Sequence, residues 1–434
     1  MDIKELVKLV KKRNVFITGG GGTGKSWSIA RLSEHLPLVI TSSTGISAVN
    51  INGQTIHSWA GIGIADRTIN EVIENLNQKK NWVRKNEILK AEYLVIDEVS
   101  MLNSYVFDYT SEVLKRIREN DKPFGGLRVI CTGDFFQLPP VKINETVEIN
   151  KAQRLIDYCF NSLAWKELDF EIINLTHVYR QNDKDFVETL NRIRYGKMNN
   201  NDQKMLEKRN FPASYEIPEE AVKLYGTNAE ADKENMKRFN ELDGKAYTYI
   251  ANDKIRSYID GRSQMVSPDN PKLQPWDKQK YDQFNEDCRV PQKLVLKEGA
   301  RVMLLHNTDV SNGLANGACG YVKRLTDYGI TVAFDNGVTT SIGEETIELR
   351  QGDKVKISRT QYPLRLAYAC TIHKSQGLTF DKVFADFNRI FAAGQAYVAL
   401  SRVTSLDGLY LKGFSPNKVF ADETVKKFYH EVVK

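Results

Sequence analysis

One octet limits what this chain can fold into more than any other stretch. It reads Gly19-Gly20-Gly21-Gly22-Thr23-Gly24-Lys25-Ser26 and directly follows the apolar run Val15-Phe16-Ile17. It fits G-x-x-x-x-G-K-[ST], the loop that binds phosphate between a buried strand and a helix. The glycines let backbone N–H groups point at phosphate oxygens, and the helix adds its positive N-terminal end. We therefore predict a nucleotide site formed by Gly20, Gly22, Thr23, Gly24, Lys25 and Ser26.

Two members of the octet have chemical roles of their own. In this motif the Lys25 ammonium binds the β- and γ-phosphates, and the Ser26 hydroxyl is one ligand of a magnesium ion. The bland alternative is a glycine-rich turn, but the Lys-Ser pair in register behind a strand argues against it. The octet therefore indicates nucleotide binding and leaves the task of the protein open.

Composition sets broad limits on the remaining possibilities. The chain has 434 residues, of which 41% are hydrophobic and 27% charged, and a net charge of +6, which permits a polyanionic partner without requiring one. Its five cysteines are widely spaced and odd in number, so neither a disulfide framework nor a zinc site is indicated. No targeting signal or membrane-length apolar run is visible. We expect two or three domains in a reducing compartment.

Short apolar runs alternate with helical patterns, which favours a parallel sheet with helices on both faces. The run Tyr93-Leu94-Val95-Ile96 ends in Asp97-Glu98, which places two carboxylates at the edge of the sheet where ligands bind. There Asp97 would hold magnesium and Glu98 would polarise the attacking water as general base. The alternative is that the acidic pair caps the next helix.

A further strand, Arg128-Val129-Ile130-Cys131, leads into Gly133-Asp134-Phe135-Phe136-Gln137-Leu138-Pro139-Pro140. A glutamine at the exit of a strand in the same sheet could reach the γ-phosphate or its attacking water. Gln137 is therefore a candidate reporter of hydrolysis. Taken alone, the segment is a loop punctuated by prolines.

The order of these motifs resembles that of the Pif-type (petite integration frequency) DNA helicases of superfamily one. The motifs that carry the resemblance are Gly20-Gly21-Gly22-Thr23-Gly24-Lys25-Ser26, Ser43-Thr44-Gly45-Ile46-Ser47-Ala48 with Thr55-Ile56-His57-Ser58, Ile96-Asp97-Glu98-Val99-Ser100-Met101, and Gly133 to Val141. Further family-like segments are Leu175 to Gln181, Leu296 to Leu305, Thr371-Ile372-His373-Lys374-Ser375-Gln376-Gly377 and Gln395 to Arg402. The ordered set spans nearly the whole chain.

The resemblance implies an α/β fold with two RecA-like domains, ATP and Mg²⁺ as cofactors, and single-stranded DNA as substrate. It implies translocation in the five-prime-to-three-prime direction and unwinding of duplexes, in DNA replication, recombination, repair or telomere or genome maintenance. The expected location is the cytoplasm, with nucleoid association, if the source is bacterial or viral. Arg180 and Arg402 match the arginines that neutralise charge on the γ-phosphate, although each could instead form an ordinary ion pair. Gln376 and Gly377 match nucleotide-contacting positions. Positions that match DNA contacts are Ser43, Thr44, Thr55, His57, His373, Lys374 and Ser375.

The resemblance also suggests a division of the chain. We expect the first RecA-like domain at 1–61 and 91–178, with a small insertion at 62–90 as a candidate strand-separating wedge and a helix from Thr68 to Leu76 within it. The second RecA-like domain is expected at 179–230 and 355–434, with an insertion at 231–354. Hairpin signals near 312–350 predict a small antiparallel barrel. This stretch resembles the SH3-like β-barrel insertion that family members carry. Residues 261–292 read as an irregular excursion.

Several alternatives stay open. Forked or tailed duplex DNA is an expected partner and four-stranded guanine structures a further candidate, with a monomer expected and a dimer on DNA as the alternative; no membrane partner is expected. An RNA-directed motor and a nucleotide-dependent binding module without turnover are the competing function classes. Met1 to Asn14 contain no glutamine, so the adenine-reading motif of related helicases is missing and selectivity for ATP is open. Trp59, Phe136 and Tyr397 could stack on bases, although aromatic residues near strand ends more often lie in a core.

Overall fold

The computed structural model separates into two compact units. Unit 1 comprises Met1–Tyr179, Leu349–Val355 and Ala421–Lys434, and unit 2 comprises Arg180–Glu348 and Lys356–Phe420. The structure describes residues 2–433 except 45–46, 49–50, 52, 64, 141–145, 150–151, 156, 213–216, 289, 307, 310–311, 313, 315 and 352–353. Gly45, Ile46 and Val141 of the quoted motifs lie outside the described residues. Among the described residues, no helix has both the length and the apolar character needed to cross a bilayer.

Unit 1 is built on a parallel sheet of six strands in the order β3-β2-β4-β5-β1-β8. The strands are β1 (Val15–Gly19), β2 (Leu38–Ser42), β3 (Gln54–Thr55), β4 (Tyr93–Asp97), β5 (Arg128–Gly133) and β8 (Glu171–Leu175). Every residue of β1 is buried, as expected for a central parallel strand covered on both faces. All the carboxyl ends lie at one edge, which is where the predicted motifs follow the strands.

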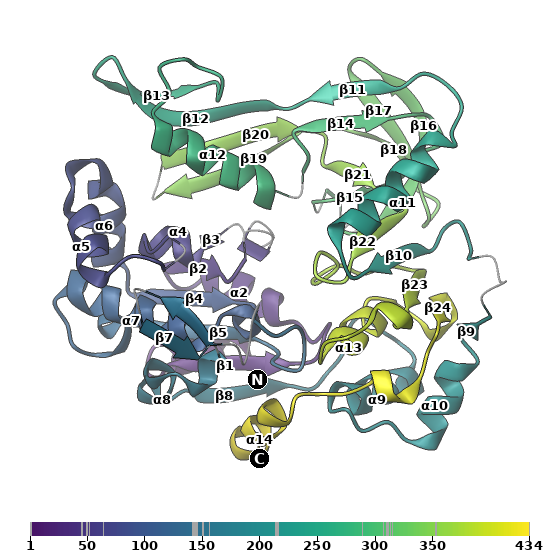
Figure 1. Ribbon diagram of the computed structural model, residues 1–434, viewed down its shortest axis with the longest axis horizontal. Coiled ribbons are helices and arrows are strands. Elements are labelled where there is room, and N and C mark those ends of the chain that lie inside the picture. Colours follow the sequence, from purple (N-terminus) through teal and green to yellow (C-terminus); the bar gives the residue numbers. More distant parts are fainter. Residues whose placement is uncertain are drawn as a thin grey trace. The chain divides into compact units, whose positions relative to one another are not determined.

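Helices cover this sheet and add a small helical pair. They are α1 (Ile3–Val10), α2 (Lys25–Ser33), α4 (Ile56–Ala60), α5 (Ile69–Asn77), α6 (Trp82–Lys90), α7 (Ser104–Arg118), α8 (Leu163–Leu168) and α14 (Glu423–Val432). The predicted helix from Thr68 to Leu76 is confirmed as α5, and Thr68 caps its N-terminus in a capping box with Glu71. Figure 1 shows α5 and α6 side by side next to α7, and both helices contact α7.

The C-terminal helix differs from the expectation that residues 355–434 all belong to the second domain, because α14 packs in unit 1. Its Phe428 ring stacks on Phe160 with centroids 4.2 Å apart. The Tyr429 hydroxyl lies 2.6 Å from Thr18 Oγ1 and accepts the Phe135 N–H at 3.2 Å. Burial of two aromatic side chains and a satisfied hydroxyl explains this placement. A hairpin of β6 (Thr146–Ile149) and β7 (Ala152–Leu155) completes unit 1.

Unit 2 contains a second parallel sheet, with strand order β22-β10-β23-β24-β9. Its strands are β9 (Asn210–Phe211), β10 (Val222–Tyr225), β22 (Ala369–Thr371), β23 (Val383–Asp386) and β24 (Leu409–Lys412). The associated helices are α9 (Lys184–Arg194), α10 (Asn200–Glu207), α11 (Asn228–Asn240) and α13 (Gln395–Leu400). Two parallel sheets, each with helices, agree with the predicted α/β fold class.

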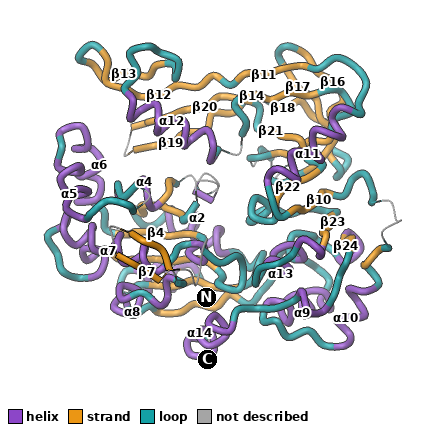
Figure 2. The backbone as a smooth tube through the Cα atoms, in the orientation of Figure 1, coloured by secondary structure: helices purple, strands orange, loops and turns teal. Residues whose placement is uncertain are grey.

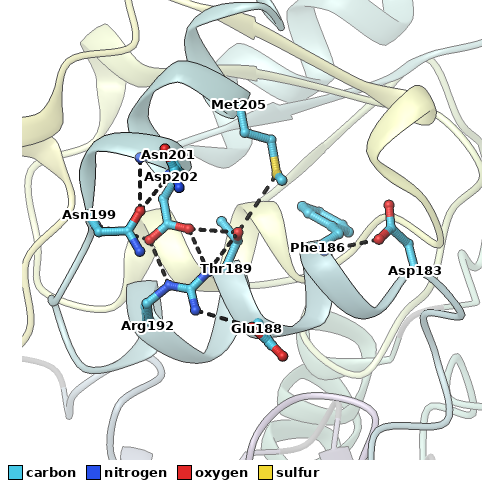
Figure 3. A network of polar contacts seen from close by, with 9 residues as sticks. All are labelled: Asp183, Phe186, Glu188, Thr189, Arg192, Asn199, Asn201, Asp202 and Met205. Atoms are coloured by element: carbon cyan, nitrogen blue, oxygen red, sulfur yellow. Dashed lines mark hydrogen bonds and ion pairs between the residues drawn. The ribbon is translucent and has the colours of Figure 1, made fainter.

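A polar network fixes α10 against α9 (Figure 3). Asp202 accepts hydrogen bonds from Arg192 at 2.7 and 2.8 Å and from the Thr189 hydroxyl at 2.8 Å. Burial acts to raise the pKa of Asp202, but the bonds from Arg192, the Asn199 N–H and Thr189 outweigh it, so the pKa is lowered. The Asn199 side chain also caps α10. The charged groups are thus satisfied locally, which makes this cluster structural.

An antiparallel part of unit 2 confirms the predicted hairpins. The strands β16 (Cys319–Thr326), β17 (Gly329–Phe334) and β18 (Thr339–Ile342) follow one another and pair with β15 (Arg301–Leu304) and β21 (Leu364–Leu366) in one five-stranded sheet. The predicted barrel limit of 350 is too long, because β19 (Glu345–Gln351) belongs to a different sheet, ordered β13-β12-β20-β19. A further pair is β11 (Tyr247–Ile250) with β14 (Lys293–Leu296).

Residues 261–292 are more regular than the sequence suggested. They contain β13 (Arg262–Val266), which pairs with β12 (Asn252–Ile259), and helix α12 (Pro275–Asp287). Figure 2 shows α12 running along β12 and β20 (Lys354–Gln361). Beneath α12, the fully buried Arg359 binds Asp253 through Nε and Nη2 at 2.9 and 2.7 Å, and the Tyr281 hydroxyl donates to Asp253 at 2.5 Å. Buried ions of this kind persist only when paired and hydrogen-bonded.

Candidate functional site

The phosphate loop connects β1 to α2 in the predicted geometry. Gly24 caps α2 in the left-handed region, with φ +94°, a conformation that favours glycine. Gly19 cannot carry a side chain, because a Cβ there would lie 2.4 Å from the Leu175 carbonyl oxygen. Lys25 Nζ donates to the carbonyl oxygens of Gly19 and Gly20 at 2.8 and 2.9 Å. The ammonium is therefore held over the loop, where the oxygens of a bound phosphate would accept hydrogen bonds from it.

Other loop contacts fix the shape of the loop. The Thr23 hydroxyl donates to the Gly20 carbonyl at 2.9 Å. The Tyr179 N–H donates to the Gly22 carbonyl at 2.9 Å, while the Tyr179 side chain is exposed. Ser26 is exposed in the first turn of α2. Tyr179 was not among the predicted site residues, although it lies inside one of the quoted motifs.

Asp97 and Glu98 lie where β4 ends. Asp97 is buried and accepts a hydrogen bond from the Thr132 hydroxyl of neighbouring β5. Burial raises the pKa of Asp97 despite the opposing hydrogen bonds from Thr132 and the Glu98 backbone and the charge of Lys25. Glu98 has φ +50°, a conformation that is rare for a residue with a side chain and is typical of functional sites. Thr132 was missed in the sequence, although a hydroxyl inside an apolar strand is a usable signal.

Gln137 closes a tight turn after β5. Its N–H donates to the Asp134 carbonyl at 2.9 Å, and the Phe136 N–H donates to the Asp134 carboxylate at 3.2 Å. Gln137 and Asp134 are both buried. Since β5 lies between β1 and β4 in the sheet, the turn follows the strand that separates the phosphate loop from the acidic pair.

The turn after β2 is hydrogen-bonded directly to the acidic pair. The Ser43 hydroxyl donates to the Glu98 carbonyl at 2.7 Å, and the Ser43 N–H donates to the Asp97 carbonyl at 3.1 Å. The register of β2 on β4, which pairs Ser42 with Asp97, brings them together. The Thr44 hydroxyl lies 2.6 Å from that of Ser47 and accepts the Ser47 N–H at 3.2 Å. Any displacement of Ser43 therefore acts on the backbone of Glu98.

Thr55 and His57 lie at the start of α4. Thr55 caps this helix, and its hydroxyl accepts the Ser58 N–H at 3.1 Å. Burial lowers the pKa of His57, so the imidazole is neutral at pH 7. β3, which ends at Thr55, pairs with β2. The two residues thus lie beside the Ser43 turn at the same edge of the sheet.

The corresponding edge of the unit 2 sheet carries the loop after β22. The N–H of Lys374 donates to the Thr371 hydroxyl at 3.1 Å, and the Gln376 N–H donates to the His373 carbonyl at 3.2 Å. Burial lowers the pKa of His373. Ser375 is fully buried and donates its hydroxyl proton to the Ile372 carbonyl at 2.7 Å, so it shapes the turn from within. Gln376 is also buried, and Gly377 has φ +80°.

Both predicted arginines are hydrogen-bonded within unit 2. Arg180, which is half-buried, donates from Nε to the Thr379 hydroxyl at 2.9 Å and from Nη1 to the Ser401 carbonyl at 3.0 Å. Arg402 is buried and donates from Nε to the Val398 carbonyl at 2.9 Å. Both guanidinium groups contact the Ser401 region, since Arg402 Nη2 also donates to the Ser401 hydroxyl at 2.8 Å.

The three aromatic candidates for base stacking are buried. Trp59, Phe136 and Tyr397 expose 1%, 2% and 4% of their surface. Phe136 stacks on Tyr429 with centroids 4.7 Å apart. Rings this deeply buried offer no open face on which a base could stack. The core interpretation of all three is correct.

Comparison with known proteins identifies the family. Residues 2–204 match the family model "PIF1-like helicase", and residues 282–325 match "DNA helicase Pif1, 2B domain". The chain is 35% identical over 431 residues to the ATP-dependent DNA helicase PIF1 of Xenopus laevis, covering 97% of this chain and 62% of that protein. It is 32% identical over 422 residues to the ATP-dependent DNA helicase Pif1 of Bdellovibrio bacteriovorus, covering 96% and 88%.

A solved structure agrees with these sequence matches. Bacteroides Pif1 in complex with ADP-AlF4 aligns with a TM-score of 0.80 at 30% identity, covering 99% of this chain and 96% of that one. The chain thus spans about three fifths of the vertebrate relative, 62% of its length, but nearly all of this bacterial one. The predicted resemblance is confirmed: the chain belongs to the Pif1-like helicase family.

Proposed function

We propose that this chain is an ATP-dependent DNA helicase that moves five-prime to three-prime on single-stranded DNA. It would unwind duplexes in replication, recombination, repair or telomere or genome maintenance. The observation that carries the proposal is that the candidate DNA-contacting turn and the candidate hydrolytic pair are hydrogen-bonded to each other at one edge of the sheet. The Ser43 turn, a predicted DNA contact, is hydrogen-bonded to Asp97 and Glu98, the predicted hydrolytic pair. Such a connection is what a DNA-stimulated motor requires and a passive nucleotide-binding module does not.

The residues present fit ATP and Mg²⁺. Ser26 offers a hydroxyl at the N-terminus of α2, and Asp97 offers a carboxylate oriented by Thr132, the oxygen ligands that magnesium prefers. The bound ion would neutralise charge on the β- and γ-phosphates. Lys25 would exchange its bonds to the loop carbonyls for bonds to phosphate oxygens. Glu98 would accept a proton from the attacking water, and Gln137 would orient that water.

The second unit supplies the remaining elements of the proposal. Arg180 and Arg402 would neutralise the charge that develops on the γ-phosphate, and Gln376 and Gly377 would contact the nucleotide, as in the two-domain scheme expected from the motifs. We propose residues 62–90, with α5 and α6, as the strand-separating wedge, and 231–354 as the second insertion. In this scheme hydrolysis alternates the two RecA-like domains between closed and open states.

DNA would contact both sheet edges through the residues expected from the sequence. In unit 1 these are Ser43, Thr44, Thr55 and His57, and in unit 2 they are His373 and Lys374, with buried Ser375 holding the loop in shape. Hydrogen bonds from such groups to phosphates fix position without reading sequence. Support comes from Bacteroides Pif1, which has been solved bound to single-stranded DNA. A further solved Pif1 structure concerns DNA unwinding at forked duplex DNA by two coordinating Pif1 helicases.

Strand displacement on tailed duplexes tests the proposal. One substrate carries a five-prime single-stranded tail and the other a three-prime tail, each with and without ATP and magnesium. Unwinding of the five-prime-tailed substrate alone is expected. Failure of single-stranded DNA to stimulate hydrolysis, or equal stimulation by an RNA oligonucleotide of the same length, would overturn the choice of DNA.

Light scattering of the free and DNA-bound protein tests the expected monomer against a dimer. A strand-displacement assay on a four-stranded guanine substrate tests whether such structures are a further partner.

Affinity for single-stranded DNA should rise as the pH falls from 8 to 6. Burial lowers the pKa of both His57 and His373 in the free protein, whereas a nearby phosphate favours the protonated imidazole. Binding then takes up protons, and each pKa unit of rise strengthens binding by up to about tenfold at low pH. The measurement is the dissociation constant across this range for the wild type and for His57→Asn with His373→Asn.

The double variant should show a flatter pH profile, and an unchanged profile would exclude these histidines as the source. Stability must be followed in parallel. A lowered histidine pKa contributes stability that is present above the unfolded pKa of about 6.5 and is lost as the pH falls through the folded pKa. The melting temperature at each pH separates this loss from the change in binding.

A further inference from the structure

One exposed aromatic ring lies at the DNA-facing edge predicted for unit 2. Phe391 exposes 73% of its surface, whereas Phe387 and Ile390 in the same connection between β23 and α13 are buried. A large apolar side chain that is left in water beside buried neighbours has no packing role of its own. It therefore differs from Trp59, Phe136 and Tyr397, which are covered.

The backbone that presents Phe391 is fixed on both sides. Gln395, the first residue of α13, is 1% exposed, and its Oε1 accepts the N–H groups of Phe391 and Ala392 at 2.9 and 3.0 Å. On the other side, the Ile390 N–H donates to the Phe387 carbonyl at 3.1 Å, and Lys418 Nζ donates to the Ile390 carbonyl at 3.2 Å. An ordered backbone lowers the entropy that a ligand must remove on binding.

The ring lies close to the loop that holds His373 and Lys374. In the sheet, β10 lies between β22 and β23, and the Ile372 N–H donates to the Tyr225 carbonyl at 2.9 Å. Gly226 follows Tyr225, and a Cβ built on it would lie 3.9 Å from Phe391 Cε1. The exposed ring thus lies beside the exit of β10, next to the strand whose exit carries His373. A side chain at position 226 would fill the space beside the ring.

We propose that Phe391 is a stacking platform for one base of the single-stranded DNA whose phosphates contact the His373–Lys374 loop. This inference rests on the proposed function, because it needs single-stranded DNA at this edge. Phosphate contacts fix the strand, and an aromatic face binds any base, since every base has a π-face. The pair of contacts suits a motor that must hold DNA without regard to sequence.

The test separates stacking from phosphate binding. Dissociation constants are measured for oligothymidylate and for an abasic tetrahydrofuran oligonucleotide of equal length, with wild type, Phe391→Ala and Phe391→Trp. Phe391→Ala should bind oligothymidylate about tenfold more weakly, in the range found for one stacked base. The abasic oligonucleotide should bind wild type and Phe391→Ala nearly equally. Phe391→Trp should, like the wild type, bind oligothymidylate more tightly than the abasic oligonucleotide. Comparison of the two ratios is a double-mutant cycle that isolates the contact.

Tyr328→Ala is the matched control, because Tyr328 is 95% exposed in the turn between β16 and β17. It should leave both dissociation constants unchanged. If Phe391→Ala keeps the wild-type ratio of the two affinities while the wild type binds DNA, the stacking role is overturned and the proposed function stands. If the wild type binds neither oligonucleotide, the proposed function fails and the inference fails with it.

Discussion

Glu98→Gln should abolish most of the ATP turnover while the protein still binds nucleotide. The amide has the shape of the carboxylate but cannot take a proton from water, and loss of a general base costs about 10²- to 10⁴-fold in rate. Both side chains carry the same backbone penalty at φ +50°, so the local backbone conformation is unchanged. The measurement is the DNA-stimulated kcat, together with the dissociation constant of a fluorescent ATP analogue.

Glu112→Gln is the control for this prediction. Glu112 lies on α7 in the same unit and pairs with Arg116 at 3.1 Å on the surface, where such pairs contribute little. Its turnover and melting temperature should match those of the wild type. Turnover of Glu98→Gln within a few-fold of the wild type would sink the assignment of Glu98 as the base, and loss of nucleotide binding would point to a folding defect instead.

The residues of unit 1 that follow strands could be predicted because two simple patterns coincide. Apolar runs such as Tyr93 to Ile96 that alternate with helical patterns favour the buried strands of a parallel sheet, and parallel strands end at one edge. The strands β1, β4 and β5 are neighbours in the sheet, and their carboxyl ends lead to Lys25, Asp97 and Gln137, of which Asp97 is the last residue of β4. The order of the motifs along the chain was therefore enough to predict which residues form the site. It did not predict the hydrogen bond from Thr132 that orients Asp97.

Other features depend on partners far away in the sequence. Asp253 and Arg359 are 106 residues apart, and neither position reveals a buried ion pair without the other. Helix α12 is mostly polar, and only one face, with Tyr281 and Phe284, is covered, so no strong helical period was visible. Likewise, an amphipathic C-terminal helix shows that one face is buried but not which sheet it covers. For this reason the sequence placed α14 in the second domain, whereas the helix belongs to unit 1.

The sequence also does not show which aromatic residues are exposed, and this decides which of them could stack on DNA bases. Trp59, Phe136 and Tyr397 lie near motif residues in the sequence, and proximity alone suggested base stacking. Whether a ring faces solvent depends on the layer above it, which sequence does not give. Phe391 has no more distinctive sequence context than these three, yet it is the exposed one.

Arg180→Ala should lower kcat by about 10³-fold and leave nucleotide affinity within a few-fold of the wild type. An arginine that stabilises the charge of the phosphoryl-transfer transition state contributes 10³- to 10⁵-fold where it has been measured. Folding should be nearly unaffected, because the Ser401 carbonyl, which accepts Arg180 Nη1, also accepts Gln181 Nε2 at 3.3 Å. The side chain is only half-buried, so its removal leaves no large cavity.

The competing explanation for Arg180 is a structural tie to Thr379 and Ser401. Thermal melting and kcat distinguish the two roles. A transition-state role predicts a large fall in kcat with an unchanged melting temperature, and only partial rescue by Arg180→Lys, because an ammonium lacks the planar fork that binds two phosphate oxygens. A structural role predicts a lower melting temperature with a proportionate loss of all activities, including nucleotide binding. Arg116→Ala, which removes a surface arginine of unit 1, should change neither quantity, since an exposed pair contributes at most about 1 kcal/mol.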